Sequence, residues 1–79
     1  MTEFLVATFY RFTTIDDLLT LQTSMENCCC ENDVRGIVLL ANEGINATIA
    51  GSREGVQEVL RFLGNDPRFE GLTWKESNA

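Results

Sequence analysis

Few residues of this chain could do chemistry, and three of them stand side by side as Cys28, Cys29 and Cys30. A tetrahedral zinc site takes four ligands, usually from separated pairs of cysteine or histidine, and the chain contains no histidine. A reactive thiolate needs nearby positive charge or a helix N-terminus, whereas the flanking Glu26 and Glu31 are acidic. We therefore expect raised thiol pKa values, no metal site and no catalytic nucleophile here, with one cysteine partly buried and two exposed.

A second candidate is the short segment Asn42 to Asn46, which lies between two apolar runs. Because Gly44 can adopt a positive φ without steric cost, the segment predicts the turn of a β-hairpin. In the simplest interpretation these residues serve only the turn, and Ile45 anchors it. In the alternative, Glu43 and Asn46 lie at the rim of a binding site or domain contact. A single glutamate is not a catalytic pair, so we expect contact and no catalytic residue.

The composition restricts the remaining function classes. The chain has 79 residues, 44% of them hydrophobic, which suffices for one domain over residues 1–79. Twelve acidic residues against six basic ones give a net charge of −6, which disfavours independent binding of nucleic acid. An odd, clustered set of cysteines is not a disulfide framework, and no apolar run approaches the ~20 residues of a membrane span. We expect a cytoplasmic protein with no membrane contact and no cofactor.

Hydrophobic periodicity predicts six elements. We expect a first helix capped by Thr14 and ending near residues 27–29, and a second helix capped by Ser52 and stopped at Gly64 and Pro67. Strands are expected over residues 4–10, 35–41, 47–50 and 72–75, the last with Leu72 and Trp74 inward. Residues 76–79 are expected to follow the last strand without a compact ending motif.

The order β-α-β-β-α-β predicts an α+β fold, the ferredoxin-like or acylphosphatase-like sandwich. Its four-stranded antiparallel sheet has the order 4-1-3-2, with both helices on one face. The other face is open, and homodimer formation through it is a hypothesis if Thr8, Tyr10 and Val38 lie there. The first strand is apolar on both sides, so its sequence leaves open which side is buried.

Two other functions occur on this fold. RNA-recognition motifs stack bases on aromatic residues of strands 1 and 3, but residues 47–50 contain no aromatic residue. Acylphosphatases use an arginine in a phosphate-binding loop after strand 1. Arg11 stands at that place, but the glycine-rich loop around it is missing. We therefore expect neither RNA stacking nor hydrolysis of acyl phosphates.

The chain also resembles a known family over nearly its whole length. The resemblance is to the N-terminal domain of the TrhO family of rhodanese-related proteins, and its most specific part is Glu43-Gly44-Ile45-Asn46. The other matching segments are Phe9-Tyr10-Arg11-Phe12, residues 36–41, Gly51-Ser52 and Asp66-Pro67-Arg68-Phe69.

The resemblance implies a larger protein than this chain. In the TrhO family an acylphosphatase-like domain precedes a rhodanese domain, whose active-site cysteine lies in a short loop with glycine and arginine. The family's activity is oxygen-dependent hydroxylation of the wobble uridine of tRNA, an oxidoreductase reaction of tRNA modification. The segment from Cys28 to Asp33 lacks the glycine and arginine of that loop. No catalytic residue is therefore carried over, and Glu43, Gly44, Ile45 and Asn46 are carried over only as the family's N-terminal signature.

We expect a non-catalytic N-terminal module of a tRNA uridine hydroxylase-like protein. Its partner would be the missing C-terminal rhodanese domain, and it would meet tRNA only through the parent protein. The alternative is a stand-alone binding or regulatory domain that uses its open sheet face for a protein partner or for self-association. Whether the chain is a fragment, which tRNAs are involved and what the cysteines do stay open at this point.

Overall fold

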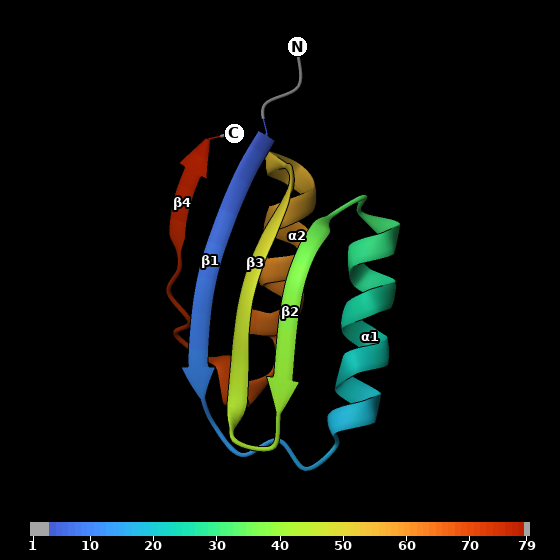
Figure 1. Ribbon diagram of the computed structural model, residues 1–79, viewed down its shortest axis with the longest axis vertical. Helices are drawn as coiled ribbons and strands as arrows, with labels where there is room; N and C mark the ends of the chain where they lie inside the picture. The colour runs from blue at the N-terminus through green and yellow to red at the C-terminus, as the bar shows by residue number, and fades with distance from the viewer. Residues whose placement is uncertain (1–3, 79) are drawn as a thin grey trace.

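The computed structural model describes residues 4–78, in which four strands and two helices form two layers (Figure 1). The sheet is antiparallel with the strand order β2-β3-β1-β4, and both helices lie on one face of it. The predicted ferredoxin-like sandwich and its strand order are confirmed. The elements are β1 (Phe4–Phe12), α1 (Leu18–Glu31), β2 (Arg35–Ala41), β3 (Gly44–Ser52), α2 (Arg53–Gly64), the 3-10 turn η1 (Pro67–Phe69) and β4 (Lys75–Asn78).

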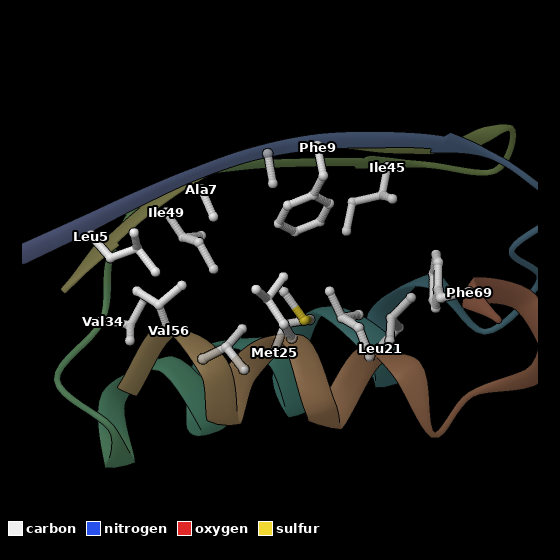
Figure 2. Packing of buried hydrophobic residues seen from close by; sticks show 14 of the residues in the cluster. Leu5, Ala7, Phe9, Leu21, Met25, Val34, Ile45, Ile49, Val56 and Phe69 are labelled. Atoms are coloured by element: carbon white, nitrogen blue, oxygen red, sulfur yellow. The ribbon is translucent and has the colours of Figure 1, made fainter. Parts of the chain in front are cut away.

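The hydrophobic core fills the space between the sheet and the helices (Figure 2). Alternate residues of the two central strands point into it, because successive side chains of a strand face opposite sides. On α2, one apolar stripe of the helix is buried in full against the sheet. The core residues are Leu5, Ala7 and Phe9 of β1, Ile45, Ala47 and Ile49 of β3, and Val56, Val59, Leu60 and Leu63 of α2, with Leu21, Met25, Ile15, Val34 and Phe69.

The register settles which residues face outward. Thr8 and Tyr10 are exposed on the open face, as the homodimer hypothesis required. Val38 is not on that face, because it lies opposite the buried Ala47 and is partly buried against the core. The condition that the homodimer hypothesis set for Val38 is therefore not met. Strand pairing, and not composition, decides which side chains of an apolar run such as residues 37–40 face outward.

The two helix starts differ from each other in how well the sequence predicted them. Ser52 caps α2 as predicted, and its Oγ accepts a hydrogen bond from the N–H of Gly55 at 3.0 Å. The predicted cap Thr14 was wrong, because α1 begins at Leu18 with Asp17 at the N-cap position. The Asp17 side chain makes no capping hydrogen bond and binds Arg68 instead.

The last strand was predicted three residues too early. Gly71 adopts a φ of +74°, and the N–H of Leu72 bonds back to the carbonyl of Phe69 at 3.1 Å, so the chain is still turning there. Pairing with β1 begins only at Lys75, opposite Thr8. Residues 76–78, expected to trail after the sheet, therefore belong to β4.

The expected inward position of Trp74 was also wrong. This side chain precedes β4, is 39% exposed and donates its indole N–H to Glu76 at 2.8 Å. Leu72, also expected inward, is partly buried against the core.

Candidate functional site

The hairpin tip between β2 and β3 is fastened to the loop between β1 and α1. The N–H of Thr13 donates to the carbonyl of Glu43 at 3.0 Å, and the N–H of Ile15 donates to the carbonyl of Asn42 at 2.9 Å. The Asn42 side chain returns a bond from Nδ2 to the carbonyl of Ile15 at 2.9 Å. Three hydrogen bonds therefore fix the backbone of the turn, and they also fix the points from which its exposed side chains project.

Two of the four signature residues serve the fold. Gly44 has a φ of +154°, as predicted, and a Cβ added there would lie 2.2 Å from the carbonyl oxygen of Arg11. Ile45 is buried under the sheet at 4% exposure. Close backbone approach and core packing explain the types of both residues, which is the simpler of the two interpretations of this segment.

The other two signature residues point away from the core. Glu43 and Asn46 are exposed, and neither side chain makes a hydrogen bond or ion pair within residues 4–78. Asn46 lies on the open face, directly between Tyr10 of β1 and Leu39 of β2 in the strand register. A carboxylate that accepts hydrogen bonds and an amide that both donates and accepts are therefore available to a partner at this end of the molecule.

A shallow hollow of about 180 Å³ gathers all four signature residues at the tip. Its lining includes Phe12 and Leu39, which sequence reasoning did not assign to any site. Alternation of polar and apolar residues along residues 4–12 and 35–41 would have shown that Phe12 and Leu39 face outward. Both strands are apolar on both sides, so the sequence does not show this alternation.

Elsewhere on the open face, exposed apolar side chains lie among polar ones such as Thr8 and Thr48. Phe12 is 81% exposed, and its ring meets that of Tyr10 edge to face with 5.9 Å between the centroids. Scattered apolar side chains on a surface are normal, whereas adjacent ones, such as the touching rings of Tyr10 and Phe12, mark a candidate interaction surface. The exposed large apolar residues whose register places them on this face are Phe4, Tyr10, Phe12, Ile37 and Leu39.

Arg11 was the candidate for phosphate binding in the sequence, but its guanidinium binds carbonyl groups of this chain. Its guanidinium donates from Nη1 to the carbonyl of Arg68 at 3.2 Å and from Nη2 to the carbonyl of Glu70 at 3.1 Å. These bonds join the end of β1 to the segment after α2. The geometry supports a structural role for Arg11.

The cysteines lie in the last turns of α1, where Cys28 and Cys29 are partly buried and Cys30 is exposed. One partly buried cysteine was expected, and the structure has two, because Cys28 and Cys29 follow the buried Met25 by three and four positions and lie on the same side of α1. Burial raises the pKa of the Cys28 thiol, and the nearby carboxylates of Glu31 and Glu58 raise it further. Burial, together with Cys28, also raises the pKa of Cys29, so both thiols are less reactive than a free cysteine at neutral pH.

Residues 4–78 contain neither a candidate metal site nor a helix that could span a membrane. No three or more cysteine, aspartate or glutamate side chains gather there in a way that could hold a metal ion. Of the helices in this part of the chain, none has the length and apolar character needed to cross a membrane.

Comparison with solved structures agrees with the fold. The structure titled BlrB, a BLUF protein in its dark state, matches all of this chain and 64% of its own with a TM-score of 0.82. At 19% sequence identity this likeness concerns the fold alone.

Comparison with curated proteins gives closer relatives. The tRNA uridine(34) hydroxylase of Albidiferax ferrireducens is 51% identical over 98% of this chain and 24% of its own length. The proteins of the same name from Acaryochloris marina and from the Wolbachia of Brugia malayi are 48% and 41% identical, with 25% and 29% of their lengths covered. The chain thus spans about a quarter of the length of these relatives.

The family model described as the UPF0176 acylphosphatase like domain matches residues 4–79. This match covers the sheet, both helices and the complete Glu-Gly-Ile-Asn segment. The chain therefore belongs to the UPF0176 acylphosphatase-like domain family, whose longer relatives carry the name tRNA uridine(34) hydroxylase, as its resemblance to the TrhO proteins predicted.

Proposed function

We propose that this chain acts as the non-catalytic N-terminal module of a tRNA uridine(34) hydroxylase. Its partner is the remainder of that protein, which the resemblance to the TrhO family identifies as containing a rhodanese domain. The module meets tRNA only as part of the whole protein, in the cytoplasm, and the remainder supplies the catalytic cysteine. The match to only about a quarter of each relative supports this division of labour.

In this proposal the hairpin tip makes the functional contact, and Gly44 and Ile45 shape it. The observation that carries the assignment is the exposure of Glu43 and Asn46 on a turn that hydrogen bonds fix to Thr13 and Ile15. A site on a fixed turn loses little conformational entropy when it binds, so more of its binding energy is available to position the bound part of the protein.

The charge of the module favours a protein contact over direct contact with RNA. A net charge of −6 repels phosphates, so a basic surface for tRNA would have to come from the remainder of the protein. Glu43 is then placed to accept hydrogen bonds from basic or amide groups of that remainder.

The test uses a full-length tRNA uridine(34) hydroxylase that carries this Glu-Gly-Ile-Asn segment. Glu43→Ala and Asn46→Ala are each expected to lower wobble-uridine hydroxylation while the melting temperature stays unchanged. The loss of one hydrogen bond to a carboxylate is worth about 1.5 kcal/mol, which corresponds to roughly tenfold in rate for Glu43→Ala. The matched control is Gln57→Ala, since Gln57 is also exposed but lies on α2, away from the hairpin tip. Full activity in both tip variants would remove the hairpin from the mechanism.

A second candidate function is favoured by the exposed apolar residues of the open face. A stand-alone domain would use this face for a protein partner or for self-association. The reading frame after residue 79 separates the two: a following rhodanese-type loop with cysteine, glycine and arginine supports the hydroxylase module, and a stop codon supports the stand-alone domain.

A further inference from the structure

The two edges of the sheet differ in how they are protected against pairing with another strand. The edge strand β4 is four residues long, fully exposed and polar, and it carries Lys75 and Glu76. Short length and charged side chains are the usual means by which an edge strand avoids new partners. The opposite edge strand, β2, is seven residues long with the sequence RGIVLLA, and its only charge is Arg35 at the first position. It therefore lacks this protection.

The helix α1 covers the space behind the outer edge of β2. Figure 1 shows α1 beside β2 and beyond the edge of the sheet, whereas α2 lies behind the central strands. A groove of about 400 Å³ runs between α1 and β2. Its lining combines the apolar side chains of Met25, Val34, Val38 and Leu40 with the polar side chains of Gln22, Glu26 and Arg35. The helix α1 therefore extends past the outer edge of β2 (Figure 1).

The front of β2 is apolar as well. Ile37 is 67% exposed and Leu39 is 63% exposed, and both lie on the open face. Val38 and Leu40 lie on the opposite side of the strand and are only partly buried. A strand paired with β2 would place alternate side chains on these two sides, and each set would meet apolar side chains.

We propose that the outer edge of β2 receives a fifth strand, supplied by the part of the longer protein that lies outside this chain. The added segment is extended and five to seven residues long, to match β2 (seven residues). Backbone hydrogen bonds to β2 provide its affinity, and one set of its alternating apolar side chains fills the groove against α1. An acidic residue of the segment lies beside Arg35. This inference rests on the proposed function, because it takes the donor from the same polypeptide.

The position of α1 argues for this donor over a second copy of the chain. If two copies paired through β2 about a two-fold axis, each α1 would lie behind the strand of the other copy, on the side where that copy has its own helices (Figure 1). A single added strand brings no helix with it and uses the cover that α1 provides. The donor has ample length, since the chain spans only 24% to 29% of its relatives.

The experiment scans synthetic 15-residue peptides against this chain. The peptides cover the part of the Albidiferax ferrireducens relative that lies outside the matched region, and binding is measured by fluorescence anisotropy. We expect one stretch of overlapping peptides to bind, and the double variant Ile37→Lys, Leu39→Lys to weaken that binding at least about tenfold. Both positions are more than half exposed, so the variant is expected to fold.

Two comparisons distinguish strand addition from simple adhesion to the apolar face. N-methylation of alternate residues of the bound peptide should abolish binding in one parity and spare it in the other, because only one set of amides pairs with β2. The matched control Phe4→Lys removes an exposed apolar side chain of the same face on β1 and should leave binding unchanged. Absence of any binding peptide, equal sensitivity to both N-methyl parities, or equal weakening by Phe4→Lys would overturn the proposal.

The result of the peptide-binding experiment can be distinguished from the result of the hairpin test. Binding at β2 together with full activity of the Glu43→Ala and Asn46→Ala variants would refute the hairpin contact and keep the fifth strand. Loss of hydroxylation in those variants without any peptide binding would keep the module and refute the fifth strand.

Discussion

Nη1 of Arg68 lies 2.6 Å from Oδ1 of Asp17, and this contact joins the turn after α2 to the start of α1. The same guanidinium binds Asp66, with 2.7 Å between Nη2 and Oδ2, and it lies 5.8 Å from the centre of the Phe69 ring. Arg11 holds the backbone of the same turn from the end of β1. The Asp-Pro-Arg-Phe segment of the family resemblance therefore ties three separate parts of the chain together.

Replacement of Arg68 is expected to destabilise the fold. Arg68→Ala removes both ion pairs, and the free energy of unfolding should fall by about 1 kcal/mol, a small value because solvent screens partly exposed pairs. The control is Arg61→Ala, which breaks only the exposed pair with Glu58 and should cost less than about 0.5 kcal/mol. Urea unfolding followed by circular dichroism measures both. Equal effects of the two variants would show that the Arg68 contacts stabilise the fold no more than a single exposed ion pair does.

The same contacts predict how stability depends on pH. Hydrogen bonds from the Arg68 side chain lower the pKa of Asp17 and that of Asp66. A carboxyl whose pKa is lower in the folded chain stabilises it fully above the unfolded value of about 4, and this contribution is lost as pH falls through the folded value. The gap in melting temperature between wild type and Arg68→Ala should therefore be constant near neutral pH and close below about pH 4. A gap that persists at about pH 2 would contradict this assignment.

The sequence predicted the fold where local signals and strand pairing agree. Residues 35–41 were predicted with their observed bounds because turn residues flank them on both sides. The alternating residues 72–75 were misassigned because pairing with β1 and the turn at Gly71 decide where β4 begins. Both are tertiary features, and a propensity pattern does not contain them.

The candidate site shows the same division. The turn at residues 42–44 and its glycine were readable because a positive φ restricts the residue type. The contribution of Phe12 and Leu39 to the hollow was not readable, since it depends on which side of two apolar strands faces outward. The hydrogen bonds from Thr13 and Ile15 to the hairpin turn were not readable either, because they join segments that lie far apart in the sequence.

Two glycines should respond in opposite directions to alanine substitution. At Gly44 the new Cβ would lie 2.2 Å from a backbone oxygen, at a φ of +154°, so Gly44→Ala should cost about 2 kcal/mol or more. At Gly64, the last residue of α2, a new Cβ meets nothing within 4 Å, so Gly64→Ala should stabilise the chain by about 0.5 kcal/mol. Thermal unfolding of both variants measures the difference. A tolerated Gly44→Ala would show that the hairpin backbone differs from the one described.

The three cysteines should react with alkylating reagents at different rates. Cys28 and Cys29 are partly buried with raised pKa values, so at about pH 7.5 each holds less of the reactive thiolate than a cysteine in a short peptide. Iodoacetamide should therefore modify the exposed Cys30 before the other two. Peptide mass spectrometry over a time course gives the three rates, and urea-unfolded chain is the control in which all three should react alike. Faster modification of Cys28 or Cys29 than of Cys30 in the folded chain would mean that α1 exposes these thiols, and in the case of Cys29 the lining of the groove beside β2 would also differ.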